Sequence, residues 1–593
     1  MCGIAGWCAE RLSPEGAAAV VAVAGRLAHR GPDDHAAWLR PEEGIALAHR
    51  RLAIIDLSPG SRQPMIDEAR GLVLAYNGEI YNFRELRAEL ENLGERFTTT
   101  GDVEVLLKAF AAWGEKSFAR LAGMFALAIW SARDRTLWLA RDAMGMKPLY
   151  LWRPPAGGIT FASEARALAA LPGFEARIRP ESLREYLEFG YVFSERETIF
   201  EGVEKLPPAE VVAIRDGRIV RRFRHFEPPR PEPSDRRSGA GRVEELSSCL
   251  ETVVAQHLIA DVPVGLLLSG GLDSSLVAAL AARRESVTTV SMGFADSAHD
   301  ERPWGARVAR AIGSRHHEVL IAPGEVAAEI EECAAIFDDL FADWGTVTTR
   351  ILYRKCRELG LKVVLVGEGS DEIFAGYPVF EPAARSRAGD WALFQLYRRY
   401  ASRRYGSLFG RFRSTMRELL AESGGDLFDA VRRFESRRQL PANYVMKVDK
   451  ASMSVSLEAR APYLDRRVAE IAYRAPVAEL LGEGTNKLLL RRVAERSGLL
   501  PPEIARRPKM GGSIAASWLD EVPQFRGFAR DVVLAPDGWA AEVGLRPAME
   551  AYFSGRPGFA FPRALSLFSH VAWRLLLLEL WSRSLGVERR LAA

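Results

Sequence analysis

The most constraining feature of the sequence is an alternation of apolar and helical segments in its second half. An apolar run at residues 262–268 is followed by a Gly/Ser-rich turn, a helical pattern at 274–283 and a second apolar run at 287–294. Two apolar runs joined by a helix form a β-α-β unit, whose strands lie parallel in one sheet. The second half of the chain therefore predicts an α/β fold.

The alternation continues beyond these two strands. Residues 317–321 and 362–366 are further candidate strands, and helical patterns separate them from their neighbours. Because parallel strands need crossover connections, helices usually cover both faces of such a sheet. From about Trp391 onward the apolar spacing indicates mostly helices. We expect a parallel sheet flanked by helices and followed by a helical C-terminal region.

A change of composition near residues 227–241 divides the chain. Prolines alternate there with charged residues, and no apolar period survives. A chain of 593 residues also exceeds what one hydrophobic core usually serves. We predict a first domain at residues 1–225, a linker at 226–242 and a second domain at 243–593.

The first domain carries short β-rich runs between turn residues. Residues 71–76, 124–130 and 136–140 are such runs, and they predict packed antiparallel sheets. Helical spacing at residues 83–93 and 103–112 predicts helices that cover these sheets. The expected class of this domain is α+β.

Composition excludes several classes of protein. Apolar residues make up 48% of the chain and charged residues 26%, and a net charge of +3 indicates no polyanionic partner. No stretch suits a signal peptide or a membrane span. The cysteines form no Cys-x-x-Cys pair, which fits a reducing cytoplasm; they are Cys2, Cys8, Cys249, Cys333 and Cys356.

Cys2 is a candidate nucleophile. If the initiator Met is removed, which a small second residue permits, Cys2 carries both a thiol and a free α-amine. The ordinary pKa of such an amine, about 8, lies close to that of a cysteine thiol, so the amine can take the thiol proton. One residue would then supply nucleophile and base, and no separate catalytic histidine is required.

Several segments of the first domain accompany Cys2 and together carry a family resemblance. They are MCGIAG at residues 1–6, RGPDD at 30–34, HRRL at 49–52, YNGEIYN at 76–82 and GD at 101–102. This set resembles the class II glutamine amidotransferase domain, an N-terminal-nucleophile hydrolase in which Cys2 would attack the glutamine amide.

The resemblance also implies how glutamine would be held. Asn77, through its side chain, and Gly78, through its backbone amide, would form the oxyanion hole that stabilises the tetrahedral intermediate. Arg51 would bind the α-carboxylate as a fork, while Glu79 and Asp102 would receive the α-ammonium group. These charges are complementary to a zwitterionic ligand.

The string SGGLDSS at residues 269–275 follows an apolar strand and opens a helix. Backbone amides and hydroxyls at such a helix N-terminus can bind phosphate. The string lacks the lysine of a kinase-type P-loop, so γ-phosphoryl transfer is not indicated. Its candidate phosphate-binding residues are Ser269, Gly270, Gly271, Asp273, Ser274 and Ser275.

A second Gly-rich loop, GEGSDE at residues 367–372, follows the candidate strand that ends at Val366. Loops after parallel strands emerge at one edge of the sheet, so the two loops can enclose one nucleotide. Asp273 and Asp371 supply hard oxygen ligands with which Mg²⁺ could bridge a triphosphate. We therefore expect ATP and Mg²⁺ as cofactors.

The two loops resemble the synthetase domain of glutamine-hydrolysing asparagine synthetases, of the ATP-pyrophosphatase type. KVD at residues 447–449, SLEARAPYLD at 456–465 and KLLLR at 487–491 extend the resemblance over nearly the whole chain. It implies that Glu368 assists formation of an acyl-adenylate and that Lys487 faces the departing pyrophosphate. The residues implied to contact the adenylate, in part through backbone, are Leu268, Met292, Val366 and Gly367.

The implied activity is ATP-dependent amidation of aspartate to asparagine, with glutamine as nitrogen donor and AMP and pyrophosphate as further products.

The sequence departs from the family pattern at two places. Val366 replaces the usual serine, and residues 338–344 read DDLFADW in place of an acidic-Glu-Pro-Phe-Ala-Asp segment. The second departure falls where an acceptor pocket would lie. An enclosed passage for ammonia between the two sites is a further expectation.

Alternative interpretations remain open at this stage. The same half-reactions could serve another carboxylate, such as a sugar acid, a peptide or a cell-envelope precursor. Arginines alternate with aromatic residues at 397–413, a pattern that nucleic-acid binders also show, although a solvated helical face or a contact between subunits explains it as well. A non-catalytic scaffold is disfavoured because both sites are intact. A homodimer is left open.

Overall fold

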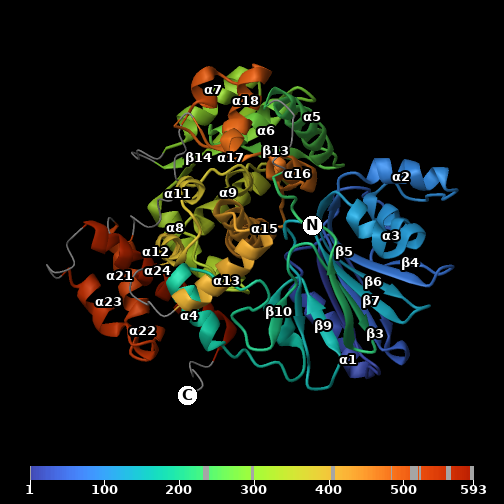
Figure 1. Ribbon diagram of the computed structural model, residues 1–593. Helices are drawn as coiled ribbons and strands as arrows, with labels where there is room; N and C mark the ends of the chain where they lie inside the picture. Colours follow the sequence, from blue (N-terminus) through green and yellow to red (C-terminus); the bar gives the residue numbers. More distant parts are fainter. Residues whose placement is uncertain are drawn as a thin grey trace.

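The computed structural model describes residues 2–231, 239–294, 300–401, 408–482, 484–507, 519, 522–555 and 562–587. Two parts lie side by side in Figure 1: a β-rich part in blue and teal, and a mainly helical part that contains a further sheet. The predicted boundaries at 225 and 242 stay a prediction. Residues 232–238 of the predicted linker lie outside the described residues.

The first part contains two six-stranded antiparallel sheets. The first sheet has the order β10-β8-β9-β1-β3-β2 and the second the order β12-β11-β7-β6-β5-β4. The strands of the first are β1 (Gly3–Cys8), β2 (Asp34–Arg40), β3 (Ile45–Arg51), β8 (Tyr150–Trp152), β9 (Ile159–Ala162) and β10 (Val203–Lys205). Those of the second are β4 (Met65–Asp67), β5 (Leu72–Ile80), β6 (Gly123–Ser131), β7 (Thr136–Arg141), β11 (Glu210–Arg215) and β12 (Arg218–Arg224).

Strand periodicity explains the layering of this part. On β1, Ile4 faces the core between the two sheets, whereas Ala5 and Trp7 face helix α1 (Pro14–Arg26) on the opposite side. On β5, Leu74 packs toward α2 (Phe83–Asn92) and α3 (Asp102–Trp113). The result is a four-layered helix-sheet-sheet-helix sandwich, which confirms the predicted packed antiparallel sheets. A further helix, α4 (Pro180–Phe189), follows them.

The second part contains the predicted parallel sheet. Its five strands run parallel in the order β15-β14-β13-β16-β17. They are β13 (Val264–Leu267), β14 (Thr288–Phe294), β15 (Arg315–Ile321), β16 (Val363–Leu365) and β17 (Glu458–Arg460). The first four coincide with the predicted strands, and α6 (Leu272–Ala282) coincides with the predicted helix. The fifth strand falls in the region that was predicted to be mostly helical.

Helices make up most of the remainder, as predicted. Before β17 they are α5 (Gly239–His257), α7 (Arg302–Ile312), α8 (Pro323–Ile336), α9 (Thr346–Glu358), α10 (Ser370–Ile373), α11 (Phe380–Arg385), α12 (Asp390–Tyr400), α13 (Phe409–Glu422), α14 (Leu427–Phe434), the π-helical η5 (Glu435–Tyr444) and α15 (Val445–Met453). After it they are α16 (Arg466–Arg474), α17 (Val477–Leu480), α18 (Leu488–Ser497), α19 (Pro502–Ala505), α21 (Pro523–Val533), α22 (Trp539–Glu542), α23 (Arg546–Phe553) and α24 (Pro562–Leu585). Among the helices that the structure describes, none has the length and apolarity needed to cross a bilayer.

Of the alternating arginines and aromatics at 397–413, the described aromatic residues make internal contacts, whereas Arg398 and Arg399 are exposed. Tyr397 and Phe412 are buried and pack with Phe189 of the first part. The guanidinium of Arg411 lies 2.7 Å from the carboxylate of buried Glu185. Residues 402–407, with Arg403, Arg404 and Tyr405, lie outside the described residues. The described aromatic residues thus form a packing surface between the two parts.

Helix α24 also joins the two parts. Buried Trp581 donates a hydrogen bond of 3.0 Å from its Nε1 to the carbonyl of Phe337, and its ring lies 5.5 Å from that of Phe200. This side chain contacts both the second part and the first, so its packing supports their relative placement.

Replacing Trp581 should therefore destabilise the folded protein strongly. Trp581→Ala should lower the free energy of unfolding by about 3–5 kcal/mol because it opens a cavity. Trp581→Phe should cost less, since it mainly removes one hydrogen bond worth about 1 kcal/mol. Trp391→Ala is the control, because that side chain is 73% exposed. Scanning calorimetry should rank the melting temperatures accordingly; equal values for Trp581→Ala and Trp391→Ala would contradict this.

Candidate active sites

Cys2 lies at the start of β1, buried between the two parts of the molecule. Its backbone nitrogen donates to Oδ1 of Asn77 at 3.0 Å, and its carbonyl accepts from Nε of Arg30 at 3.1 Å. Burial raises the pKa of the Cys2 thiol, while the positive charges of the chain terminus and Arg51 oppose this rise. Hydrogen bonds to the backbone nitrogen and to the backbone carbonyl of Cys2 thus hold the predicted nucleophile in place.

Asn77 and Gly78 lie beside Cys2 on β5. The Asn77 side chain is fully buried, and its Nδ2 has no hydrogen-bond partner among the residues that the structure describes. A buried amide donor without a partner is costly, so a ligand oxygen would satisfy it. A Cβ atom at position 78 would lie 2.0 Å from the carbonyl oxygen of Met124, which only glycine avoids. This geometry suits the oxyanion hole that the resemblance implies.

Arg51, Glu79 and Asp102 surround the same site. Arg51 donates from Nη1 to the carbonyl of Ser58 at 3.0 Å and from Nη2 to the carbonyl of Asp56. The Oε2 of buried Glu79 has no hydrogen-bond partner. Within the described residues, Glu79 therefore offers a free acceptor for a ligand ammonium group.

Asp102 and Glu79 differ in their hydrogen bonds and in the charges around them. Asp102 accepts hydrogen bonds from the Tyr76 hydroxyl and the Ile80 amide, both at 2.9 Å. Burial raises the pKa of Asp102, and these hydrogen bonds act against that rise. Burial, and then the negative charges of Glu458 and Asp102, raise the pKa of Glu79 well above its ordinary value. An arriving cation would relieve this accumulation of negative charge.

The second site starts at the loop between β13 and α6, in the strand-loop-helix setting that was predicted. The hydroxyls of Ser269 and Ser274 lie 3.0 Å apart, and the Gly271 amide donates to Ser269 Oγ at 3.3 Å. Gly270 has a φ of +69°, and a Cβ atom there would lie 2.5 Å from the backbone of Trp304. The loop is compact and requires glycine at this position.

A cavity of about 540 Å³ opens above this loop. Most of the candidate ATP-site residues line it: Leu268, Ser269, Gly271, Asp273, Ser274, Met292, Gly367, Glu368 and Asp371. Gly270, Ser275 and Val366 are not among its lining residues, because the loop turns Gly270 toward Trp304 and the other two are buried. The loops after β13 and β16 thus meet at one cavity, as their positions in a parallel sheet require.

Lys487 lies between the two candidate metal ligands. Its Nζ is 2.6 Å from Oδ2 of Asp273, 2.8 Å from Oδ1 of Asp371 and 3.0 Å from Oγ of Ser370. Asp273 Oδ1 is buried without a hydrogen-bond partner. Two carboxylates converge here beside the phosphate loop, and Mg²⁺ is usually held by one or two carboxylates together with substrate phosphates. The residues therefore fit Mg²⁺ bound with a nucleotide.

One wall of the cavity contains three residues that were not predicted individually as site residues, although the segment at 338–344 was expected near an acceptor pocket. Asp343, Trp344 and Lys447 line it, and Lys447 Nζ lies 3.6 Å from Oδ1 of Asp343. Trp344 donates from Nε1 to Nδ1 of His570 at 2.8 Å and stacks on Trp573. Asp343 and Trp344 belong to the departure at 338–344 and Lys447 belongs to the KVD string, so these strings were the available signal.

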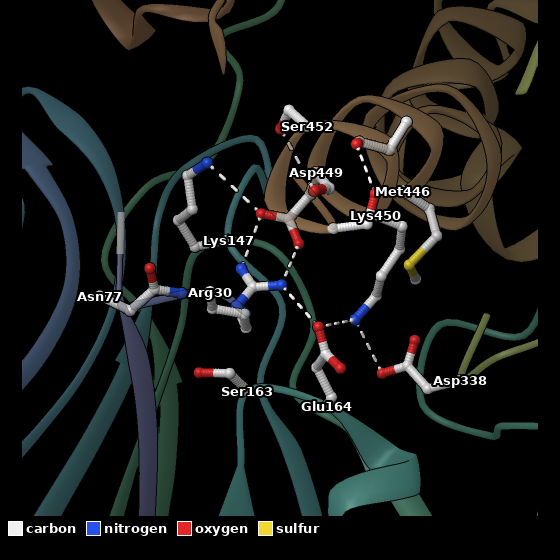
Figure 2. A network of polar contacts seen from close by, with 12 residues as sticks. Arg30, Asn77, Lys147, Ser163, Glu164, Asp338, Met446, Asp449, Lys450 and Ser452 are labelled. Atoms are coloured by element: carbon white, nitrogen blue, oxygen red, sulfur yellow. Dashed lines mark hydrogen bonds and ion pairs between the residues drawn. The ribbon is translucent and has the colours of Figure 1, made fainter. Parts of the chain in front are cut away.

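A buried network of charges lies between the two sites, and the sequence gave no indication of it (Figure 2). Arg30 donates to both carboxylate oxygens of Asp449, at 2.8 and 2.9 Å, and to Glu164 at 2.9 Å. Lys450 Nζ lies 3.2 Å from Glu164 and 2.9 Å from Asp338, and Lys147 lies 3.5 Å from Asp449. The side chains of these six residues are at most 3% exposed. It joins the first part to α15 of the second.

The pKa of Glu79 predicts how the first site responds to pH. Because burial raises this pKa, protonation of Glu79 begins at a higher pH than the ordinary value of 4.5 would give. A neutral acid attracts an ammonium group less than a carboxylate does. The KM for glutamine hydrolysis should therefore rise as the pH falls. Glu79→Gln should show a high KM with a flatter pH profile, and parallel profiles for the two proteins would contradict the assignment.

Comparisons with known proteins agree with this geometry. The family model described as glutamine amidotransferase domain matches residues 1–226, and the one described as asparagine synthase matches residues 245–583. A Mycobacterium tuberculosis relative is 33% identical over 86% of this chain and 87% of its own. Asparagine synthetase [glutamine-hydrolyzing] 3 of Bacillus subtilis is 30% identical over 86% of each chain, and asparagine synthetase B [glutamine-hydrolyzing] of Escherichia coli is 29% identical over 84% of this chain and 79% of its own. The chain belongs to the asparagine synthase family.

Proposed function

We propose that this protein is a glutamine-hydrolysing asparagine synthetase. It converts ATP, L-aspartate, L-glutamine and water into L-asparagine, L-glutamate, AMP and diphosphate. The observation that carries the proposal is the cavity where the SGGLDSS loop, Glu368 and the Asp273–Lys487–Asp371 cluster meet, in the same chain as a buried Cys2 with an unpaired oxyanion donor.

In the first half-reaction Cys2 attacks the amide carbon of glutamine, after its α-amine has taken the thiol proton. The unpaired Nδ2 of Asn77 and the backbone amide of Gly78 donate to the oxyanion that develops. Arg51 binds the α-carboxylate, and Glu79 with Asp102 binds the α-ammonium group. Ammonia leaves, and water then releases glutamate from the cysteine.

In the second half-reaction the acceptor carboxylate attacks the α-phosphate of ATP, and pyrophosphate leaves. The helix N-terminus of the SGGLDSS loop binds phosphate oxygens, and Lys487 offsets the negative charge of the leaving group. Asp273 and Asp371 would hold Mg²⁺, which supplies charge neutralisation at the phosphates when bound. Glu368 assists formation of the acyl-adenylate. Ammonia then attacks the carbonyl carbon of the acyl-adenylate and displaces AMP, which gives the amide.

The charges of the cavity favour an amino acid as acceptor. Its acidic lining residues are Asp273, Glu301, Asp343, Glu368, Asp371 and Glu372, whereas Lys447 is the one cation among the lining residues of the described chain. Lys487, which is not a lining residue, pairs with Asp273 and Asp371, so the surplus of negative charge lies with the other acids. An acceptor that carries an ammonium group beside its carboxylates suits this surplus of negative charge better than a polyanion does. Lys447 and Asp343, 3.6 Å apart, form a pair of opposite charges that matches the zwitterionic end of aspartate.

A second acceptor stays a candidate because Trp344 lines the cavity at the point where the sequence departs from the family pattern. A large aromatic side chain there could instead stack on a sugar acid or on a cell-envelope precursor.

The cysteines of the described residues are all free thiols, in keeping with the cytoplasmic location that we infer from the sequence.

Product analysis tests the proposal. The purified protein, given glutamine, Mg-ATP and aspartate, should form asparagine and AMP in equal amounts. Cys2→Ala should lose the glutamine-driven reaction and keep the reaction driven by free ammonia, because the two sites are chemically separate. If the wild-type protein hydrolyses glutamine and yet forms no asparagine from either nitrogen source, aspartate is the wrong acceptor.

A further inference from the structure

Helix α15 contributes to both sites at once. Lys447, in its first turn, lines the ATP cavity and pairs with Asp343. Asp449 lies two residues further along, about 200° around the helix axis. Its carboxylate therefore leaves the cavity and reaches Arg30 in the other part of the molecule, at 2.8 and 2.9 Å. Figure 2 shows Asp449 extending from its helix toward Arg30.

Arg30 in turn holds the nucleophile. All three of its guanidinium nitrogens are used: Nε donates to the carbonyl of Cys2, Nη1 to Glu164 and Asp449, and Nη2 to Asp449. The guanidinium is planar and rigid, so a bidentate carboxylate fixes the orientation of its remaining edge. The position of the Cys2 carbonyl thus depends on where Asp449 holds this plane.

We propose that Asp449 is a positioning residue of the glutaminase site, supplied by the synthetase half of the chain and acting on Cys2 through Arg30. The proposal rests on the function proposed above for Cys2. On this proposal, the glutaminase site is structurally complete only when α15 is in place. The helix that lines the ATP cavity through Lys447 then also aligns Cys2 through Asp449.

The charge of Asp449 is needed for this task. The six fully buried members of the network are three cations, Arg30, Lys147 and Lys450, and three anions, Glu164, Asp338 and Asp449, so their charges balance. The partly exposed His29 also lies 3.2 Å from Glu164 and adds a positive charge only when it is protonated. Burial alone would raise the pKa of Asp449, but the charges of Arg30 and Lys147 lower it to about 2. Asp449 therefore stays ionised, and its loss would leave a buried surplus of positive charge that must rearrange.

A second charged side chain of the synthetase half also reaches the glutaminase site. Arg460 of β17, fully buried, lies 3.7 Å from Oε1 of Glu79, the acid that we assign to the glutamine ammonium group. Its guanidinium is also bound to Glu458 and to the carbonyls of His257 and Ile259. Two charged side chains of the synthetase half thus face the glutaminase site, one toward the nucleophile and one toward the substrate-binding acid.

Asp449→Asn tests the proposal with Asp339→Asn as its matched control. Asp339 is also a buried aspartate of the synthetase half that crosses the interface, accepting from Lys205 Nζ at 3.0 Å and from the Ile199 amide at 2.8 Å. Within the described part of the chain, its hydrogen bonds and ion pair do not involve Arg30 or Cys2. Steady-state glutamine hydrolysis and ammonia-driven asparagine formation are measured for both variants, together with their melting temperatures.

We expect Asp449→Asn to lower kcat for glutamine hydrolysis by about 100-fold, the effect of displacing a reacting group by about 1 Å. Its KM for glutamine should change little, because Arg51, Glu79 and Asp102 are untouched, and ammonia-driven synthesis should persist. Asp339→Asn should keep the wild-type ratio of the two activities. The proposal would be overturned if the ratio of glutamine hydrolysis to ammonia-driven synthesis were the same in Asp449→Asn as in Asp339→Asn. An equal loss of both activities in a folded Asp449→Asn protein would overturn it as well.

Asp449→Glu covers the case in which Asp449→Asn fails to fold. It keeps the charge and moves the carboxylate by one methylene, so hydrolysis should fall less steeply than in a charge-removing variant while synthesis from ammonia is retained. Full wild-type hydrolysis in Asp449→Glu would mean that the position of the carboxylate is irrelevant. Absence of asparagine in the wild-type protein would instead count against the proposed acceptor, because glutamine hydrolysis is measured separately.

Discussion

The buried charge network between the two parts of the molecule is the interaction on which the arrangement of both sites depends. Removing six charges from water is costly, and such clusters often contribute little net stability. Their value lies in geometry: any slip of one part against the other would leave a buried charge unpaired. We infer that Arg30, Glu164 and Asp449 fix one relative placement of the sheets, with Cys2 on one side and the ATP cavity on the other.

In both sites, functional side chains lie on strands or on the residues directly before or after them. Cys2 precedes β1 and Asn77 lies on β5, so the two packed sheets hold nucleophile and oxyanion donor in register. In the other part, β13 and β16 are adjacent and parallel, so the loops that follow them bring Asp273 and Asp371 to one lysine. Rigid strands thus position side chains that approach one another only through tertiary structure.

The sequence predicted whatever is encoded locally. Apolar periodicity located β5, β6 and β7 of the first part, β13 to β16 of the second, and helix α6, whereas the other strands of the first part were not predicted. The SGGLDSS and GEGSDE strings identified two loops that do meet at one cavity. Strand β17 was missed because it is three residues long and two of them, Glu458 and Arg460, are charged yet buried as a pair. The Arg30–Asp449 contact spans 419 positions, and no local pattern encodes such a pairing.

We infer that nitrogen released at Cys2 is used at the ATP cavity of the same molecule. The most direct test supplies glutamine labelled with ¹⁵N in its amide, together with Mg-ATP, aspartate and an excess of unlabelled ammonium. An enclosed route between sites held in fixed register predicts asparagine that retains the ¹⁵N label almost undiluted. Asparagine carrying the isotope ratio of the bulk ammonium would show that the two sites exchange ammonia with solvent, which would contradict the account.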